Sequence, residues 1–281
     1  MTSFDTPAPI SVNAHVEAGS IQFAASDRVD TVVEVRPREA KKEMDQKTAD
    51  QTEVTYSSGV LVVRTPKSSL FGRTGVVDIT VELPANSRID LSGAWAQVLG
   101  QGQLGEVRVK TSSGDVRLDA TGPLRVTASH GSIVVDRVEG GADISTSSGS
   151  VRVGFLDGPA VLKNSHGTTT VGVARGGELR VNGAHGEIDI HRAEDSVTAT
   201  TAHGGLRVGE VVRGNVQLET NSGAIEVGIG HGSAAWLDVS SNHGQVRNLL
   251  EPSDAPAEAE DAVQVRARTR HGNIDIIRAK S

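Results

Sequence analysis

The chain has 281 residues, no cysteine, 32 glycines, seven aromatic residues and a formal net charge of −7. The absence of cysteine excludes a disulfide framework, a thiolate metal site and a cysteine nucleophile. Charges of both signs are interspersed along the chain, so no basic patch favours a nucleic-acid partner. Because aromatic side chains usually fill large cores, so few of them indicate a thin core of Val, Ile, Leu and Ala.

Neither a membrane span nor a secretory signal is recognisable. No run of 18 apolar residues occurs, so we expect no membrane partner. Residues 1–7 lack the basic and apolar regions of a signal peptide, and we therefore expect a cytoplasmic location.

Residues 1–88 are predicted to form a β-rich cap that leads into a repeat region. Apolar alternation predicts strands over residues 10–16, 21–24, 31–36, 53–56, 60–64 and 76–83. Residues 37–50 are charged and non-periodic, which indicates a loop or a short helix. A cap is expected because the ends of a repeat array need to be covered.

A short phrase that ends in glycine recurs through residues 89–281. A Ser or His directly precedes a glycine at Ser113, His130, Ser148, His166, His185, His203, Ser222, His243 and His271. Successive glycines are 17 to 21 residues apart, and the last interval is 28. A degenerate copy precedes them, with Ala96 at the glycine place and Trp95 before it. Such regular spacing is typical of a repeat architecture.

Each repeat has room for two short strands and two tight turns. Apolar and polar residues alternate around the glycine, as at Val151/Val153 and Ile188/Ile190. Residues 89–281 are therefore predicted to form a right-handed parallel β-solenoid of about nine to ten two-strand rungs of 18–19 residues. The acidic, Pro/Ala-rich residues 251–262 account for the long interval and are expected to form a loop insertion.

Small residues three places before each glycine are expected to form a structural hydrogen-bond ladder. They are Thr111, Ala128, Thr146, Asn164, Gly183, Thr201, Thr220, Ser241 and Thr269.

The repeat phrase also carries a family resemblance. Residues 111–118 (TSSGDVRL) and 146–153 (TSSGSVRV) match a recurring phrase of Thr, Ser and Gly followed by Asp or Ser and alternating apolar residues. In this respect the chain resembles the bacterial putative-adhesin β-strand-repeat family, a domain of unknown function. The resemblance implies a β-solenoid over essentially the whole chain and supplies no catalytic residues. This sequence differs from the family pattern by having His in place of Ser in six repeats.

Those six histidines are the sharpest candidate site. Stacked rungs would place His166, His185 and His203 side by side, His243 and His271 in a second pair, and His130 between Ser113 and Ser148. In one interpretation these residues only shape turns before glycine. In another they sense pH, because protonated neighbouring rings repel one another and acid would loosen this edge. In a third they bind a divalent metal such as zinc, the one cofactor that the sequence suggests.

The sequence predicts a non-enzymatic β-solenoid that acts as a scaffold or protein-interaction surface. A protein partner or self-association is expected, since residues 263–277, taken as the last rung, would leave an edge open to end-to-end assembly. A glycan-active β-helix enzyme is an alternative. However, its nearest carboxylates, Glu187, Asp189 and Glu226, are expected two rungs apart with Arg207 between them, as on a solvated charged face.

Overall fold

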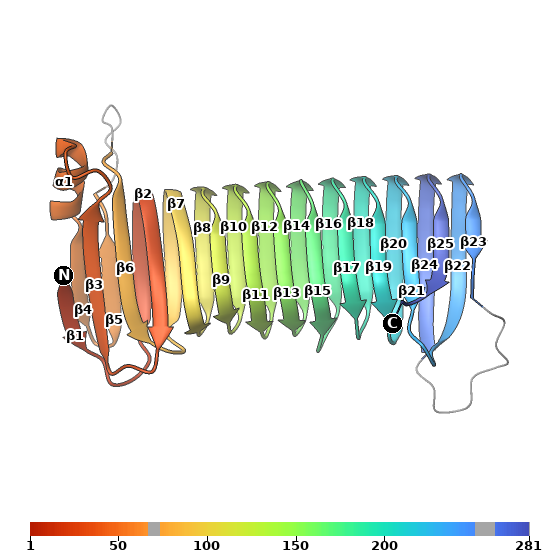
Figure 1. Ribbon diagram of the computed structural model, residues 1–281, viewed down its shortest axis with the longest axis horizontal. Coiled ribbons are helices and arrows are strands. Elements are labelled where there is room, and N and C mark those ends of the chain that lie inside the picture. Colours follow the sequence, from red (N-terminus) through yellow and green to blue (C-terminus); the bar gives the residue numbers. More distant parts are fainter. Residues whose placement is uncertain (67–73, 251–261, 281) are drawn as a thin grey trace. The chain divides into compact units, whose positions relative to one another are not determined.

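The computed structural model describes residues 1–66, 74–250 and 262–280 of a chain that is almost entirely β-strand (Figure 1). The chain divides into two compact units, Met1–Glu139 and Gly140–Ser281, called the first and the second unit below. The division between the two units lies inside the repeat region. The boundary between cap and repeats that the sequence predicts at residues 88 and 89 stays a prediction.

The first unit joins a mixed sheet to parallel rungs. Its elements are β1 (Thr2–Asp5), β2 (Ser11–Ser26), β3 (Asp30–Pro37), α1 (Glu43–Asp50), β4 (Glu53–Ser57), β5 (Val60–Arg64), β6 (Val77–Pro84), β7 (Arg88–Leu104), β8 (Val107–Ser113), β9 (Val116–Thr121), β10 (Leu124–His130) and β11 (Ile133–Glu139). β1 pairs antiparallel with β3, β3 with β6, and β4 with β5. In these pairings β3 and β4 lie antiparallel beside β6 and β5, and α1 lies in the segment predicted as a loop or short helix. The cap over residues 1–88 stays a prediction.

The short helix α1 is anchored by a buried carboxylate. Asp45 accepts hydrogen bonds from the backbone N–H of Val76 at 2.9 Å and of Glu39 at 3.2 Å. Because both donors lie outside the helix, this side chain ties α1 to the start of β6.

A rung that the sequence interpretation missed is formed by β2. This strand pairs in parallel with residues 88–101 of β7, so that Ala18 aligns with Trp95 and Gly19 with Ala96. The apolar pattern of the repeats is present here as well, since Ile21 and Phe23 follow Gly19 by two and four residues. The sequence predicts separate strands over residues 10–16 and 21–24 outside the rungs. That prediction is wrong, because residues 11–26 form one continuous strand that belongs to a rung.

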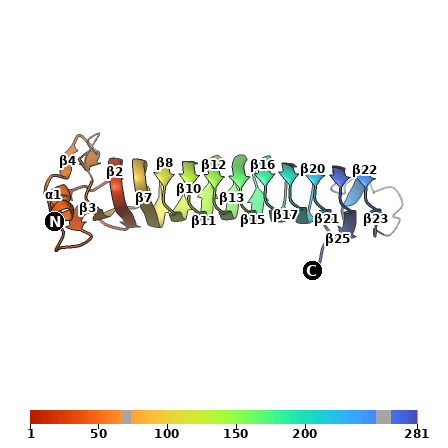
Figure 2. The same ribbon diagram turned by 90° about the horizontal axis from the view of Figure 1, so that it is seen from above.

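The second unit is a stack of parallel two-strand rungs. Its strands are β12 (Ala142–Ser148), β13 (Val151–Asp157), β14 (Ala160–His166), β15 (Thr169–Arg175), β16 (Leu179–His185), β17 (Ile188–Ala193), β18 (Val197–His203), β19 (Leu206–Val211), β20 (Gly214–Ser222), β21 (Ile225–Ile229), β22 (Ala234–His243), β23 (Val246–Asn248), β24 (Ala262–His271) and β25 (Ile274–Arg278). Even-numbered strands pair with one another in one layer, and odd-numbered strands in the other (Figure 2). The predicted parallel β-solenoid is confirmed.

The interior between the two layers is narrow and aliphatic. Val, Ile, Leu and Ala fill it, and Phe23 is the one aromatic residue in the buried core of the described residues. Both tryptophans lie outside, with Trp95 69% and Trp236 71% exposed. The low aromatic content of the chain is therefore a consequence of the thin core.

The last rungs do not stack in sequence order. β24 pairs with β20 on one side and with β22 on the other, and β25 likewise lies between β21 and β23 (Figure 1). The terminal rung is β22–β23, so our expectation that residues 263–277 form the last rung is wrong. Val263, Val265 and Ala267 of β24 are fully buried, whereas Leu237 and Val239 of β22 are half-buried. This difference in burial follows from position, because β24 has a strand on both sides and β22 pairs only with β24 among the described strands.

The predicted insertion at 251–262 cannot be compared with the structure in most of its length. Residues 251–261 lie outside the described residues, and Ala262 is the first residue of β24.

Candidate functional site

The Ser and His residues that directly precede the repeat glycines, called the ladder residues below, occupy equivalent places at the ends of their strands. In the second unit Ser148 aligns with His166, His166 with His185, His185 with His203, and His203 with Ser222. Beyond Ser222 the column continues through His271 to His243. In the first unit His130 aligns with Ser113. The register therefore brings the histidines together as the repeat spacing predicts.

Their imidazole rings form two face-to-face stacks. The ring centroids of His166 and His185 are 5.0 Å apart with planes 3° from parallel. Those of His185 and His203 are 4.9 Å apart at 6°, and those of His243 and His271 are 4.9 Å apart at 14°. All five rings are exposed to solvent. The predicted neighbours are confirmed, with Ser222 separating the two stacks.

This stacking leaves metal binding as an untested prediction. In parallel rings about 5 Å apart, equivalent nitrogens are also about 5 Å apart. A zinc ion holds imidazole nitrogens at about 2.0–2.1 Å, so two ligands of one ion lie no more than about 4.2 Å apart. The rings would have to turn toward each other before they could share an ion. Within residues 1–66, 74–250 and 262–280, no group of three or more His, Asp or Glu side chains is arranged to hold a metal.

The glycines that follow the ladder residues form a column in which each one packs closely against the backbone of a neighbouring rung. Gly186 has φ +141°, and a Cβ built on it would lie 2.1 Å from the carbonyl oxygen of Gly167 on the preceding rung. The N–H of Gly167 donates to the carbonyl of His185 at 2.9 Å. Backbone contacts thus fix the corner, and the ladder side chain is free to be Ser or His.

Most of the small residues three places before each glycine donate side-chain hydrogen bonds to the backbone, as predicted, whereas Ala128 and Gly183 have no side-chain donor. Thr220 Oγ1 donates to the carbonyl of Gly204 at 3.1 Å, and Thr269 Oγ1 to that of Gly223 at 3.0 Å. Asn164 replaces the hydroxyl with an amide whose Nδ2 donates to the Gly149 carbonyl at 3.0 Å. The donor side chains Asn164, Thr220 and Thr269 are buried, so this column is part of the edge of the core.

Two of the carboxylates of the enzyme alternative, Asp189 and Glu226, are held in surface ion pairs. Arg207 lies between Asp189 and Glu226 in the register of β17, β19 and β21. Its Nε is 3.1 Å from Glu226, and its Nη1 is 3.5 Å from Asp189. The hydrogen bond to Glu226 and the charge of Asp189 raise the pKa of Arg207 above its usual value. This arrangement is that of a charged face, and it brings no acid and base together for hydrolysis.

The terminal rung carries exposed apolar side chains that the sequence interpretation did not single out. Trp236 is 71%, Val246 43% and Leu249 64% exposed. Among the described residues β22 pairs only with β24, so one edge of β22 has no strand beside it. The outward position of Trp236 could have been inferred, because it precedes the inward Leu237 in the alternating pattern.

No helix in the described part of the chain is long and apolar enough to cross a membrane.

The geometry defines a parallel β-solenoid whose candidate sites are surfaces and edges. Within that class the chain belongs to the Toastrack DUF4097 family, whose model matches residues 9–277. The predicted family resemblance is thereby confirmed. Comparison with curated proteins gives no match.

One solved structure of low sequence identity supports the same fold, and others are similar over most of their length. A putative adhesin from Parabacteroides merdae is 14% identical, with 80% of this chain and 94% of that chain covered and a TM-score of 0.51. A putative adhesin from Parabacteroides distasonis is 14% identical over 98% of this chain and 95% of that one, with a TM-score of 0.46. A putative lipid binding protein from the same species is 12% identical over 99% and 96%, also with a TM-score of 0.46.

Proposed function

We propose that this protein is a non-enzymatic, cytoplasmic binding scaffold that pairs with a second copy of itself through the terminal rung β22–β23. The observation that carries this proposal is the edge of β22 that no other described strand pairs with, together with the exposed side chains of Val246 and Leu249. The name of the structurally similar Parabacteroides merdae protein, a putative adhesin, also fits a binding protein.

The edge lacks the features that normally prevent pairing with another chain. Edge strands are usually blocked by Pro, by inward-pointing charges or by bulges. The ten residues of β22 contain no Pro and no Lys. Their one acidic side chain, Asp238, is bound by Arg266 and Arg268 of the neighbouring strand β24. The backbone groups along the free edge are thus open to a further strand.

A second copy fits this edge better than an open-ended filament. In the first unit, antiparallel β3 and β4 cover β6 and β5, so the N-terminal rungs present no parallel edge to receive β22. A dimer in which β22 of one copy pairs with β22 of the other does not need a free edge in the first unit. A two-fold axis across the rung makes the paired strands antiparallel and closes the assembly at two.

Sedimentation velocity from micromolar to millimolar protein tests this proposal. We expect a monomer–dimer equilibrium that the double variant Val246→Lys/Leu249→Lys shifts to monomer, because paired cations would then face each other at the seam. Val29→Lys is the matched control, since Val29 is an apolar residue of the first unit that is 66% exposed. A monomer at every concentration would overturn the proposal, as would a dimer that the double variant leaves intact.

We propose acid sensing as a second candidate function, because the imidazole stacks are observed at about 5 Å. Protonation would place like charges on adjacent rungs along one exposed edge. Such an edge would loosen in acid without any ligand.

A further inference from the structure

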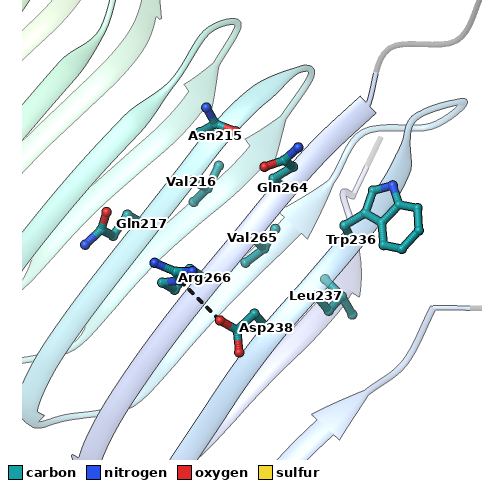
Figure 3. A pocket seen from close by; sticks show the side chains of 9 residues that line it. All are labelled: Asn215, Val216, Gln217, Trp236, Leu237, Asp238, Gln264, Val265 and Arg266. Carbon is teal, nitrogen blue, oxygen red and sulfur yellow. Dashed lines mark hydrogen bonds and ion pairs between the residues drawn. The ribbon is translucent and has the colours of Figure 1, made fainter.

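An open groove of about 530 Å³ lies on the outer face of β20, β24 and β22 in the second unit (Figure 3). Its side chains come from three neighbouring strands, and β24 supplies its floor. The polar and aromatic residues that line it are Asn215, Gln217, Gln264, Arg266, Trp236 and Asp238.

The strand register arranges these side chains in two rows. Gln264 aligns with Asn215 on one side and with Trp236 on the other. Two residues further along the strands, Arg266 aligns with Gln217 and with Asp238. Val216 and Val265 stand between the rows and point into the core, as the alternation of a strand requires. The outer face therefore carries one row of two amides and an indole, and a second row of an amide, a guanidinium and a carboxylate.

Trp236 provides an apolar platform at one end of the first row. Its indole is 71% exposed. Within the described residues it makes no hydrogen bond and no ring contact. An exposed indole leaves a large apolar area in water, which burial against a ligand would remove. In a chain with seven aromatic residues, this outward placement is not explained by core packing.

The amides of the groove are free to bind a ligand. Among the described residues, the side chains of Asn215, Gln217 and Gln264 take part in no intramolecular hydrogen bond. Each amide offers both a donor and an acceptor.

The arginine of the second row is held in place. Asp238 accepts from Arg266 Nε at 3.1 Å and from Arg268 Nη2 at 2.7 Å. The hydrogen bond from Arg268, reinforced by Arg266, holds the pKa of Asp238 below its usual range, so this carboxylate stays charged. Two guanidinium groups thus share one carboxylate and keep N–H donors for a further acceptor.

We propose that this groove binds an oligosaccharide. One face of a pyranose ring is lined by C–H groups with partial positive charge, which match the negative face of the Trp236 indole. Sugar hydroxyls both donate and accept, as the amides of Gln264 and Asn215 do. The second row, Arg266 and Gln217, then contacts the adjacent sugar or a uronate carboxylate. A stacked nucleic-acid base is the less suitable occupant, because the chain carries a net charge of −7.

This inference goes beyond the self-association proposed above and uses a different surface. Trp236 belongs to β22 but points to the outer face of the sheet, whereas pairing uses the backbone edge of that strand together with Val246 and Leu249. Trp236→Ala should therefore still form the dimer, and Val246→Lys/Leu249→Lys should still bind the sugar. Failure of one proposal is thus distinguishable from failure of the other.

The test uses the fact that the chain has two tryptophans. In the full-length Trp95→Phe protein, Trp236 is the sole indole fluorophore, and its emission reports on the groove. We would titrate it with cellohexaose, chitohexaose and hexagalacturonate, which are a neutral, an N-acetylated and an acidic oligosaccharide. A single-stranded DNA oligomer serves as the competing class. We expect a saturable emission change with at least one sugar at micromolar to millimolar concentration and none with the DNA.

Variants then assign the binding, measured by calorimetry with the same sugar. Trp236→Ala should weaken it at least tenfold and Gln264→Ala a few-fold. Trp95→Ala, which removes an equally exposed indole in the first unit, should leave it unchanged. Far-UV circular dichroism establishes that each variant is folded. The proposal is overturned if none of the three sugars gives a saturable change, if DNA alone binds, or if folded Trp236→Ala binds as tightly as the wild type.

Discussion

The glycine column under the ladder gives the most direct test of how the rungs are held together. Alanine at Gly186 places a Cβ 2.1 Å from the Gly167 carbonyl oxygen, where ordinary contacts begin at 3.4 Å. The rungs would have to separate by more than an ångström at this corner. That movement breaks the bond from Gly167 N–H to the His185 carbonyl at 2.9 Å. It also strains the bond from Gly186 N–H to the His203 carbonyl at 2.8 Å.

The expected loss can be assembled from these contacts. The left-handed backbone at φ +141° costs an alanine about 1–2 kcal/mol. Two weakened hydrogen bonds cost about 0.5–1.5 kcal/mol each. Together with the forced shift of neighbouring backbone, we expect Gly186→Ala to lower the free energy of unfolding by about 3–5 kcal/mol.

Gly232→Ala is the matched control for this substitution. Gly232 also has a positive φ, +85°, but a Cβ there would meet no atom within 4 Å. It should therefore lose only the backbone contribution, about 1–2 kcal/mol. Urea unfolding followed by circular dichroism measures both variants, and hydrogen exchange at the Gly167 amide locates the damage. Equal losses in the two variants would refute the claim that close contact between rungs makes Gly186 necessary.

Three further predictions concern the Asp78 carboxylate, the buried Asn164 and the stack of His166, His185 and His203. Burial raises the pKa of Asp78, but hydrogen bonds from Arg38 and Ser20 outweigh it and leave that pKa lowered. Asp78→Asn should therefore cost about 0.5–1 kcal/mol at neutral pH, discounted for exposure. The difference from wild type should vanish as the pH falls below about 4 and through the lowered pKa; a difference that persists at pH 2 would contradict this. Asn164 is buried with Oδ1 unpartnered, so Asn164→Thr should match or exceed wild-type stability by up to about 1 kcal/mol, whereas Asn164→Ala should lose about 1–2 kcal/mol in urea unfolding. Replacing His166, His185 and His203 together by Ser should reduce the drop in thermal unfolding midpoint between pH 8 and pH 5. Each adjacent charged pair contributes about 1 kcal/mol of repulsion in water, and an unchanged drop would exclude this stack as the acid-sensitive element.

The repeat architecture was predictable because its physics is local. A glycine, an alternating strand on each side and a small hydroxyl residue three places earlier recur at a fixed spacing. This pattern was sufficient to predict the parallel rungs, the histidine neighbours and the threonine hydrogen bonds. The rung of β2 carries the same signature around Gly19, but β3, α1 and β4 to β6 separate it in sequence from the other rungs. The regular spacing between repeat glycines therefore does not reveal the rung of β2.

The order of the last rungs was not predictable from the periodicity. β22 and β24 present equivalent residues to their neighbours, since Leu237 matches Val265 and His243 matches His271. The alternation of these two strands does not distinguish the inner from the outer place, and the periodicity alone would stack the rungs in chain order. The groove could not be predicted from the sequence for the same reason. Its residues Asn215, Gln264 and Trp236 become neighbours only because β24 lies between β20 and β22.

The inserted rung has a consequence for how the chain is made. During synthesis residues 234–248 leave the ribosome before residues 262–278. At that moment β24–β25, which pair with β20–β21 in the finished stack, have not yet emerged. Among the described strands β22–β23 pairs only with β24–β25. The outermost rung is therefore synthesised before the rung on which it docks.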